Sequence, residues 1–161
     1  MDSDSNGGRF PAVPGRNLAG TKYALPGDFE GDLNLAIVAF RRRHQADVDT
    51  WIPVGDRLEA ATPGFRYYEL PVIDRLYRPG RAFIDGGMRA AIADRATRER
   101  TITLYVDARA FRQALEIPSK ETIHVLLVDP EGAVHWRTQG RRTDAAKRAL
   151  EMALDERLQN G

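Results

Sequence analysis

Four cationic side chains follow the first strongly apolar segment of the chain. Residues 34–40 read NLAIVAF, as expected for a buried strand, and a pattern typical of a helix begins a few residues later. The residues between them are Arg41, Arg42, Arg43 and His44. In α/β folds, ligands bind at loops between the carboxyl end of a strand and the next helix. Free helix N–H groups and guanidinium forks suit phosphate or carboxylate, so we predict that this loop binds an anion or an acidic partner.

The alternative interpretation of the same residues is a solvated loop. Its arginines would then pair with the nearby Asp47 or Asp49, or with another loop. Exposed ion pairs contribute only about 0–1 kcal/mol each to folding, so stability alone does not account for three consecutive arginines. The two interpretations predict different effects of replacing the arginines on binding.

Nucleophilic chemistry has few candidate residues. The absence of cysteine excludes disulfides, thiolate catalysis and cysteine-ligated metal. Ser3, Ser5 and Ser119 are the only serines, and none lies in a GxSxG turn. We therefore predict that the protein is neither a thiol oxidoreductase nor a peroxidase. The alternative is a small-molecule anion-binding protein, or a cysteine-independent enzyme, that holds its ligand with the Arg41–His44 loop.

Two further histidines, His124 and His135, fall on opposite strands of an expected hairpin. Without a carboxylate at suitable spacing, two histidines do not make a metal site. We expect half-buried imidazoles bonded to polar neighbours, and we predict no metal and no other cofactor.

Composition limits the class of protein. A length of 161 residues suits one domain, and a net charge of +1 argues against nucleic acid as a partner. No apolar run is long enough to span a bilayer, and the acidic start MDSDSNGG is unlike a signal peptide. We expect a cytoplasmic protein with a flexible N-terminal arm (1–17) and a single domain (18–161). Because only 3 of the 24 basic residues are lysine, the usage also suits a GC-rich bacterial genome.

The expected elements alternate between strands and helices. Strands are predicted at 34–40 and 101–107, and one at 65–71 that Pro71 stops. A hairpin is predicted at 122–138, where a DPEG turn joins two apolar runs. Helices are predicted at 44–61, kinked at Pro53, within the arginine-rich segment 74–100, at 108–115, and after the capping residue Thr143.

This order resembles the thioredoxin-like fold, an α/β fold with a central mixed sheet, helices on both faces, a helical insertion and a C-terminal helix. In that family the second redox cysteine lies five residues before a kinking proline, which here is Pro53. The resemblance places the two cysteine positions at Gln45 and Val48, and the position of the family's cis-proline at Ile123. It also implies that residues 34–40, 66–70 and 122–128 are neighbouring strands, with helices containing Trp51 and Leu154 packed on them.

A narrower resemblance involves the segments GRNLAG and LPGDFEG and the hairpin VLLVDPEGAVHWRTQG. These look like the cysteine-poor, thioredoxin-like assembly factors of mitochondrial ATP synthase, which act on the proton-channel subunit. This chain departs from that family because its acidic start is unlike a transit peptide. The resemblance implies a non-catalytic binding, assembly or chaperone-type factor whose partner is another protein. The alternative partner is an anionic small molecule.

Overall fold

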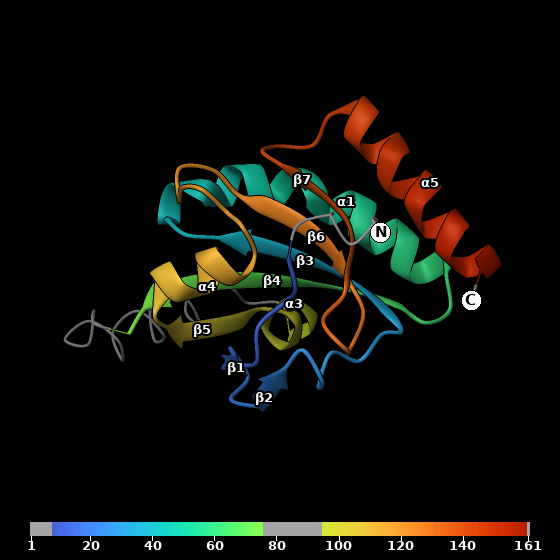
Figure 1. Cartoon of the computed structure of the whole chain (residues 1–161). Coiled ribbons are helices and arrows are strands. Elements are labelled where there is room, and N and C mark those ends of the chain that lie inside the picture. The colour runs from blue at the N-terminus through green and yellow to red at the C-terminus, as the bar shows by residue number, and fades with distance from the viewer. Residues whose placement is uncertain (1–7, 76–94, 161) are drawn as a thin grey trace.

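A seven-stranded mixed sheet with helices on both faces forms the protein, as the computed structural model shows for residues 8–75 and 95–160 (Figure 1). The strands are β1 (Val13–Asn17), β2 (Lys22–Leu25), β3 (Leu33–Ala39), β4 (Phe65–Asp74), β5 (Ile102–Val106), β6 (His124–Val128) and β7 (Val134–Gln139). The helices are the 3₁₀ turn η2 (Arg42–His44), α1 (Gln45–Ala61), α3 (Arg95–Arg100), α4 (Ala108–Ala114) and α5 (Asp144–Asn160). Within the described ranges, no helix is both long and apolar enough to cross a bilayer.

The centre of the sheet is β4-β3-β6, within the order β2-β1-β5-β4-β3-β6-β7. β3 runs parallel to β4 and antiparallel to β6, so that Ile37 lies between Glu69 and Val125. Six of the seven β3 residues are buried, as expected for a strand covered on both faces. The three predicted segments are therefore neighbouring strands, which confirms that expectation.

One face of the sheet packs against α1 and α5. Trp51 is completely buried, and Leu150 and Leu154 of α5 belong to the same apolar cluster. α1 continues through Pro53 and lies close to the sheet at Gly55, where an added Cβ would be 2.7 Å from the Cγ of Tyr67. The predicted packing of both helices on the sheet is confirmed.

The opposite face packs against α4 and the N-terminal segment. Phe10 is buried between Phe29 and Phe111, with ring centroids 5.5 and 5.6 Å away. β1 pairs with β2 on one side and with β5 on the other. The prediction of a flexible arm over residues 1–17 is wrong for its second half, because Phe10 is buried and β1 pairs with both β2 and β5. Residues 1–7 lie outside the described residues.

Pro71 does not stop its strand, since β4 extends to Asp74. Pro71 lies opposite Ala39, the last residue of β3, so the missing N–H falls where the β3–β4 ladder ends. Beyond it, Val72 pairs with Leu104 of β5. The strand therefore loses β3 as a neighbour at the proline and continues beside β5 instead of ending there.

The C-terminal part agrees with the predicted pattern. β6 and β7 form the hairpin, with a register shift at Leu127/Val128, and Gly132 in the turn has a φ of +95°. The Thr143 hydroxyl accepts a hydrogen bond from the N–H of Ala146 at 3.0 Å, which caps α5. Both predictions are confirmed.

The arginine-rich segment 74–100 lies mostly outside the described residues. Its last turn is α3, which Arg100 fastens to α1. The guanidinium of Arg100 makes two contacts of 3.1 Å with the carboxylate of Glu59 and lies 4.0 Å from the centroid of the Tyr67 ring. This arginine has a structural role.

Candidate functional site

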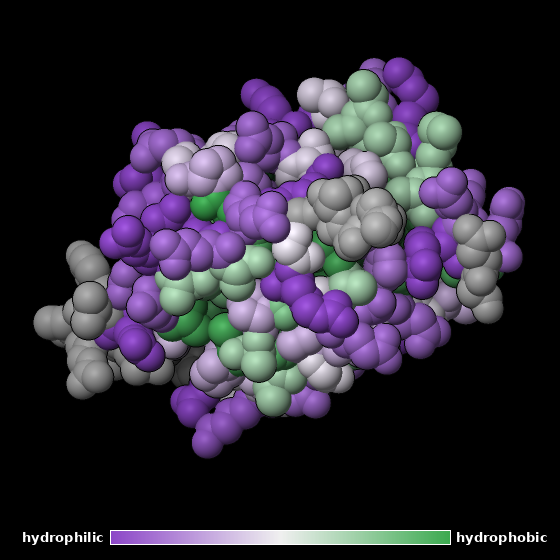
Figure 2. Space-filling model, in the orientation of Figure 1, coloured by the Kyte–Doolittle hydropathy of each residue, from purple (hydrophilic) through white to green (hydrophobic). Residues whose placement is uncertain are grey.

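Three loops meet at the end of the sheet where β3 ends and α1 begins. Glu121, in the loop before β6, contacts His44 at the start of α1. Gly140, after β7, donates a backbone hydrogen bond to Ile123 and accepts one from the Trp51 indole. We call the exposed and half-exposed cations of these loops the basic edge: Arg41, Arg42, Arg43, Lys120, Arg141 and Arg142. Figure 2 shows mostly hydrophilic surface at this end of the molecule, where α1 begins in Figure 1.

His44 is buried and fastens the α1 loop to the loop before β6. Its Nδ1 accepts hydrogen bonds from the N–H groups of Phe40 (3.2 Å) and Arg41 (3.3 Å), and its Nε2 lies 3.2 Å from the carbonyl oxygen of Glu121. The ring is therefore neutral, with its proton on Nε2, because N–H groups only donate and carbonyl oxygens only accept. Burial lowers the pKa of His44, and the nearby Arg43 and Arg41 lower it further.

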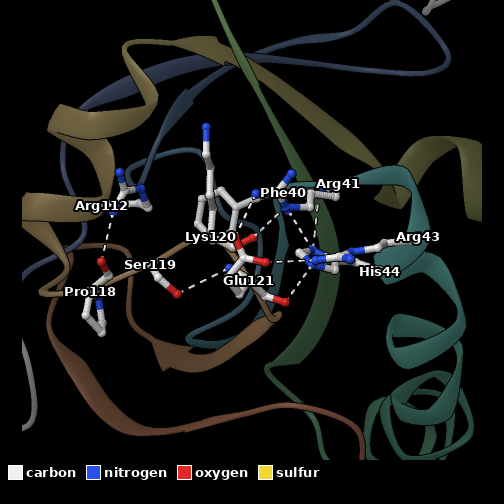
Figure 3. A network of polar contacts seen from close by, with 9 residues as sticks. All are labelled: Phe40, Arg41, Arg43, His44, Arg112, Pro118, Ser119, Lys120 and Glu121. Atoms are coloured by element: carbon white, nitrogen blue, oxygen red, sulfur yellow. Dashed lines mark hydrogen bonds and ion pairs between the residues drawn. The ribbon is translucent and has the colours of Figure 1, made fainter.

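Arg41 and Arg43 both bind the Glu121 carboxylate. Figure 3 shows this carboxylate between the two arginines, with one oxygen 2.8 Å from Arg41 and the other 2.9 Å from Arg43. Arg41 also donates from Nε to the carbonyl oxygen of Lys120 at 3.2 Å. The charge of Arg41, followed by its hydrogen bond and then Arg43, lowers the pKa of Glu121. Arg42 is exposed and makes no polar side-chain contact within the described residues.

The predicted redox positions are divided between an apolar interior and the surface. Val48 and Ile123 are 2% and 0% exposed and belong to the same apolar cluster as Trp51. Gln45 is the first residue of α1 and is exposed; its amide donates to Asp49 at 2.8 Å. None of these side chains can form a thiolate, so the described site has no group for disulfide exchange.

The residues that sequence reasoning missed are acids. The solvated-loop alternative named Asp47, Asp49 or another loop as partners of the arginines; the structure shows another loop, whose Glu121 binds Arg41 and Arg43. Glu69 is only 8% exposed, and its Oε1 lies 3.5 Å from the amide nitrogen of Gln45. Burial raises the pKa of Glu69. The single acidic residue in the strand FRYYELP was the available signal for Glu69, whereas no spacing pointed to Glu121.

The two hairpin histidines do not meet. His124 is buried beside Phe40, with 6.5 Å between the two ring centroids. Burial lowers the pKa of His124 to about 4, and Arg137 and His44 act in the same direction. His135 is half-buried, with its Nε2 2.8 Å from the Oδ2 of Asp129. In the part of the chain that the structure describes, no three potential ligands gather at a metal-binding distance.

No protein-family model and no curated protein matches the sequence, but solved structures match nearly the whole chain. One is a thiol:disulfide interchange protein from Bacteroides sp., with 19% identity, a TM-score of 0.57, and coverage of 94% of this chain and 91% of that one. Another is BsSco, of the Sco family of cytochrome c oxidase assembly proteins, with 13% identity, a TM-score of 0.60, and coverage of 91% and 94%. The exposed lipoprotein thioredoxin Etrx1 from Streptococcus pneumoniae has 14% identity, a TM-score of 0.60, and coverage of 91% and 99%.

At these identities the likeness establishes the fold. The chain has the thioredoxin-like fold, which confirms the fold class expected from its sequence. Two of the three neighbours are named for thiol–disulfide exchange or thioredoxin, whereas this chain has no cysteine. The scaffold is therefore retained without the residues that thiol chemistry needs.

Proposed function

We propose that this chain is a single thioredoxin-like domain that acts as a non-catalytic binding factor for another protein. The observation that supports it best is the surroundings of the positions where the resemblance places the redox residues. Val48 and Ile123 are buried in the apolar core, and Gln45, at the first of the two expected cysteine positions, is exposed. A thioredoxin-like fold can still present the surface around these positions to another chain when the thiols are gone.

The basic edge is the proposed binding surface. Its cations are exposed or half-exposed, and Arg42 has no polar partner among the described residues. Exposed ion pairs contribute little to folding, so a cluster of arginines here is better explained by recognition than by stability. Guanidinium groups recognise carboxylates through directional paired hydrogen bonds.

The finer proposal is an assembly or chaperone-type role. It is supported by the resemblance of the chain to the ATP synthase assembly factors in the β6–β7 hairpin and in two earlier segments, 15–20 and 25–31. The first segment belongs to the β1–β2 hairpin, where the buried Asn17 accepts hydrogen bonds from the N–H groups of Ala19 and Thr21. The second segment precedes β3, whereas the basic edge begins where β3 ends. In this proposal the two segments maintain the scaffold and the basic edge binds the partner.

Site-specific photocrosslinking tests the proposal. Benzoylphenylalanine replaces Arg42 in one variant and Arg16, an exposed residue of β1, in a matched control. Each full-length variant is irradiated in extract of the native cells, and the adducts are identified by mass spectrometry. We expect one protein to be enriched at position 42 over position 16. Equal labelling at the two positions would contradict a specific protein partner at the basic edge. If the adduct at position 42 forms in low-salt buffer but is lost when millimolar phosphate is added, a small anion is favoured over a protein partner.

A further inference from the structure

The carboxylate of Glu121 is held by two arginines although it belongs to an exposed loop. Its side chain is 62% exposed, and Arg41 and Arg43 each donate to a different one of its oxygens, at 2.8 and 2.9 Å. Such a carboxylate gains little from these contacts, because water competes for both partners. It can therefore leave the two guanidinium groups at small cost.

Arg41 is oriented by contacts that do not involve this carboxylate. Arg41 Nε donates to the carbonyl oxygen of Lys120, and the Arg41 N–H donates to the buried ring of His44. The same ring binds the carbonyl oxygen of Glu121, so the backbone of that residue stays in place when its side chain moves. The guanidinium of Arg41 therefore stays in position to bind another carboxylate after the Glu121 side chain has rotated away, and the exposed Arg43 lies beside it.

We propose that Glu121 is an internal substitute for a carboxylate of the partner, and that an acidic protein segment displaces it. This inference rests on the proposed binding function and names the chemistry of the partner. The charge of this surface agrees with it: the basic edge carries six cations, whereas the other acids at this end include Asp144, which is paired with Arg142, and Asp47 and Asp49 of α1. An extended segment with several carboxylates can bind both the pair Arg41 and Arg43 and the neighbouring Arg42, whereas a single small anion can bind at only one of these places.

Displacement predicts that removing the Glu121 charge strengthens binding of an acidic chain. The probe is fluorescein-labelled hexaglutamate, measured by fluorescence anisotropy with the full-length protein at low salt, with hexaglutamine as the neutral reference. The test variant is Glu121→Gln. The matched control is Glu131→Gln, which changes the net charge equally at an exposed position in the turn at the other end of β6.

We expect Glu121→Gln to tighten hexaglutamate binding by about threefold to tenfold, because two exposed charge-assisted donors become available. Glu131→Gln should change it by less than about twofold, since salt screens a distant charge. Adding Arg41→Ala and Arg43→Ala to Glu121→Gln should abolish the gain. Circular dichroism and the melting temperature establish that each variant is folded.

Equal tightening by the two glutamine variants would overturn the inference, because it would show a general charge effect. Unchanged or weaker binding by folded Glu121→Gln would also overturn it. These outcomes are separable from the proposed function. Specific crosslinking at position 42 without tightening by Glu121→Gln leaves the binding function and removes the displacement by Glu121. If Glu121→Gln binds hexaglutamate more tightly but no protein is crosslinked at position 42, the carboxylate-binding site is supported and the protein partner is rejected.

Discussion

We predict that acid weakens the folded state through His124, which lies at the start of β6. The side chain is 4% exposed and packs against Phe40. Burial lowers its pKa to about 4, and the positive Arg137 and the nearby His44 act in the same direction. The imidazole is therefore neutral in the folded protein over a range of pH in which an unfolded chain would protonate it.

Whether acid stabilises or destabilises the fold depends on whether the folded or the unfolded state binds the proton more tightly. Stability from this group is fully present above the pKa of the unfolded chain, about 6.5, and is lost as the pH falls towards the folded value. With a folded pKa of about 4, lowering the pH from about 7.5 to about 4.5 costs about 2.5 kcal/mol through His124 alone. For a urea dependence of about 2 kcal/mol per molar, the unfolding midpoint falls by about 1 M.

The assay is urea unfolding at both pH values, followed by circular dichroism, for the wild type and for His124→Leu and His124→Gln. Other titrating groups contribute to the wild-type loss, so the informative quantity is the loss in the wild type minus the loss in each variant. We expect this difference to be about 2.5 kcal/mol for both variants. An NMR titration of the imidazole provides an independent value of its pKa.

Two results would refute the reasoning. One is a loss of stability in His124→Leu as large as in the wild type, which would show that another group titrates. The other is an imidazole that titrates in the folded protein near its ordinary pKa, which would show that solvent reaches the ring. Because His44 also contributes to the low pKa of His124, the pair of single variants and their double variant measure the coupling between the two rings.

Three other predictions concern catalysis, helix packing and the arginine loop. The purified protein should show no insulin-reductase or thiol-peroxidase turnover above a heat-killed control, because without a thiolate no mixed disulfide forms. Gly55→Ala should lower the free energy of unfolding by about 1–3 kcal/mol despite the better helix propensity of alanine, since the new Cβ would lie 2.7 Å from the Tyr67 ring. The control in the same urea assay is Gly27→Ala, which should be tolerated because the atom nearest to its new Cβ is 3.7 Å away. His44→Ala should destabilise the protein by about 1–3 kcal/mol, because it leaves two backbone N–H groups without their acceptor. Replacing Arg41, Arg42 and Arg43 together by alanine should lower the melting temperature much less than His44→Ala. A larger loss of stability in the triple variant than in His44→Ala would contradict a structural role for His44 and a binding role for the arginines.

Local pattern was enough to predict most elements. The apolar run 34–40 and the DPEG turn are short-range signals, and they identified a central strand and a hairpin because burial and turn geometry depend on adjacent residues. The capping role of Thr143 depends on a residue three positions away. The absence of cysteine needs no structure at all.

The partners of the basic edge were decided only by the tertiary structure. Glu121 lies 80 residues from Arg41 and 78 from Arg43, and nothing in its local sequence distinguishes it from any other loop acid. The arm was mispredicted for the same reason: Phe10 is buried only because Phe29 and Phe111 are brought to it by the sheet. Charge pairing and aromatic packing depend on distance in space, whereas sequence periodicity reports only which side of its own element a residue occupies.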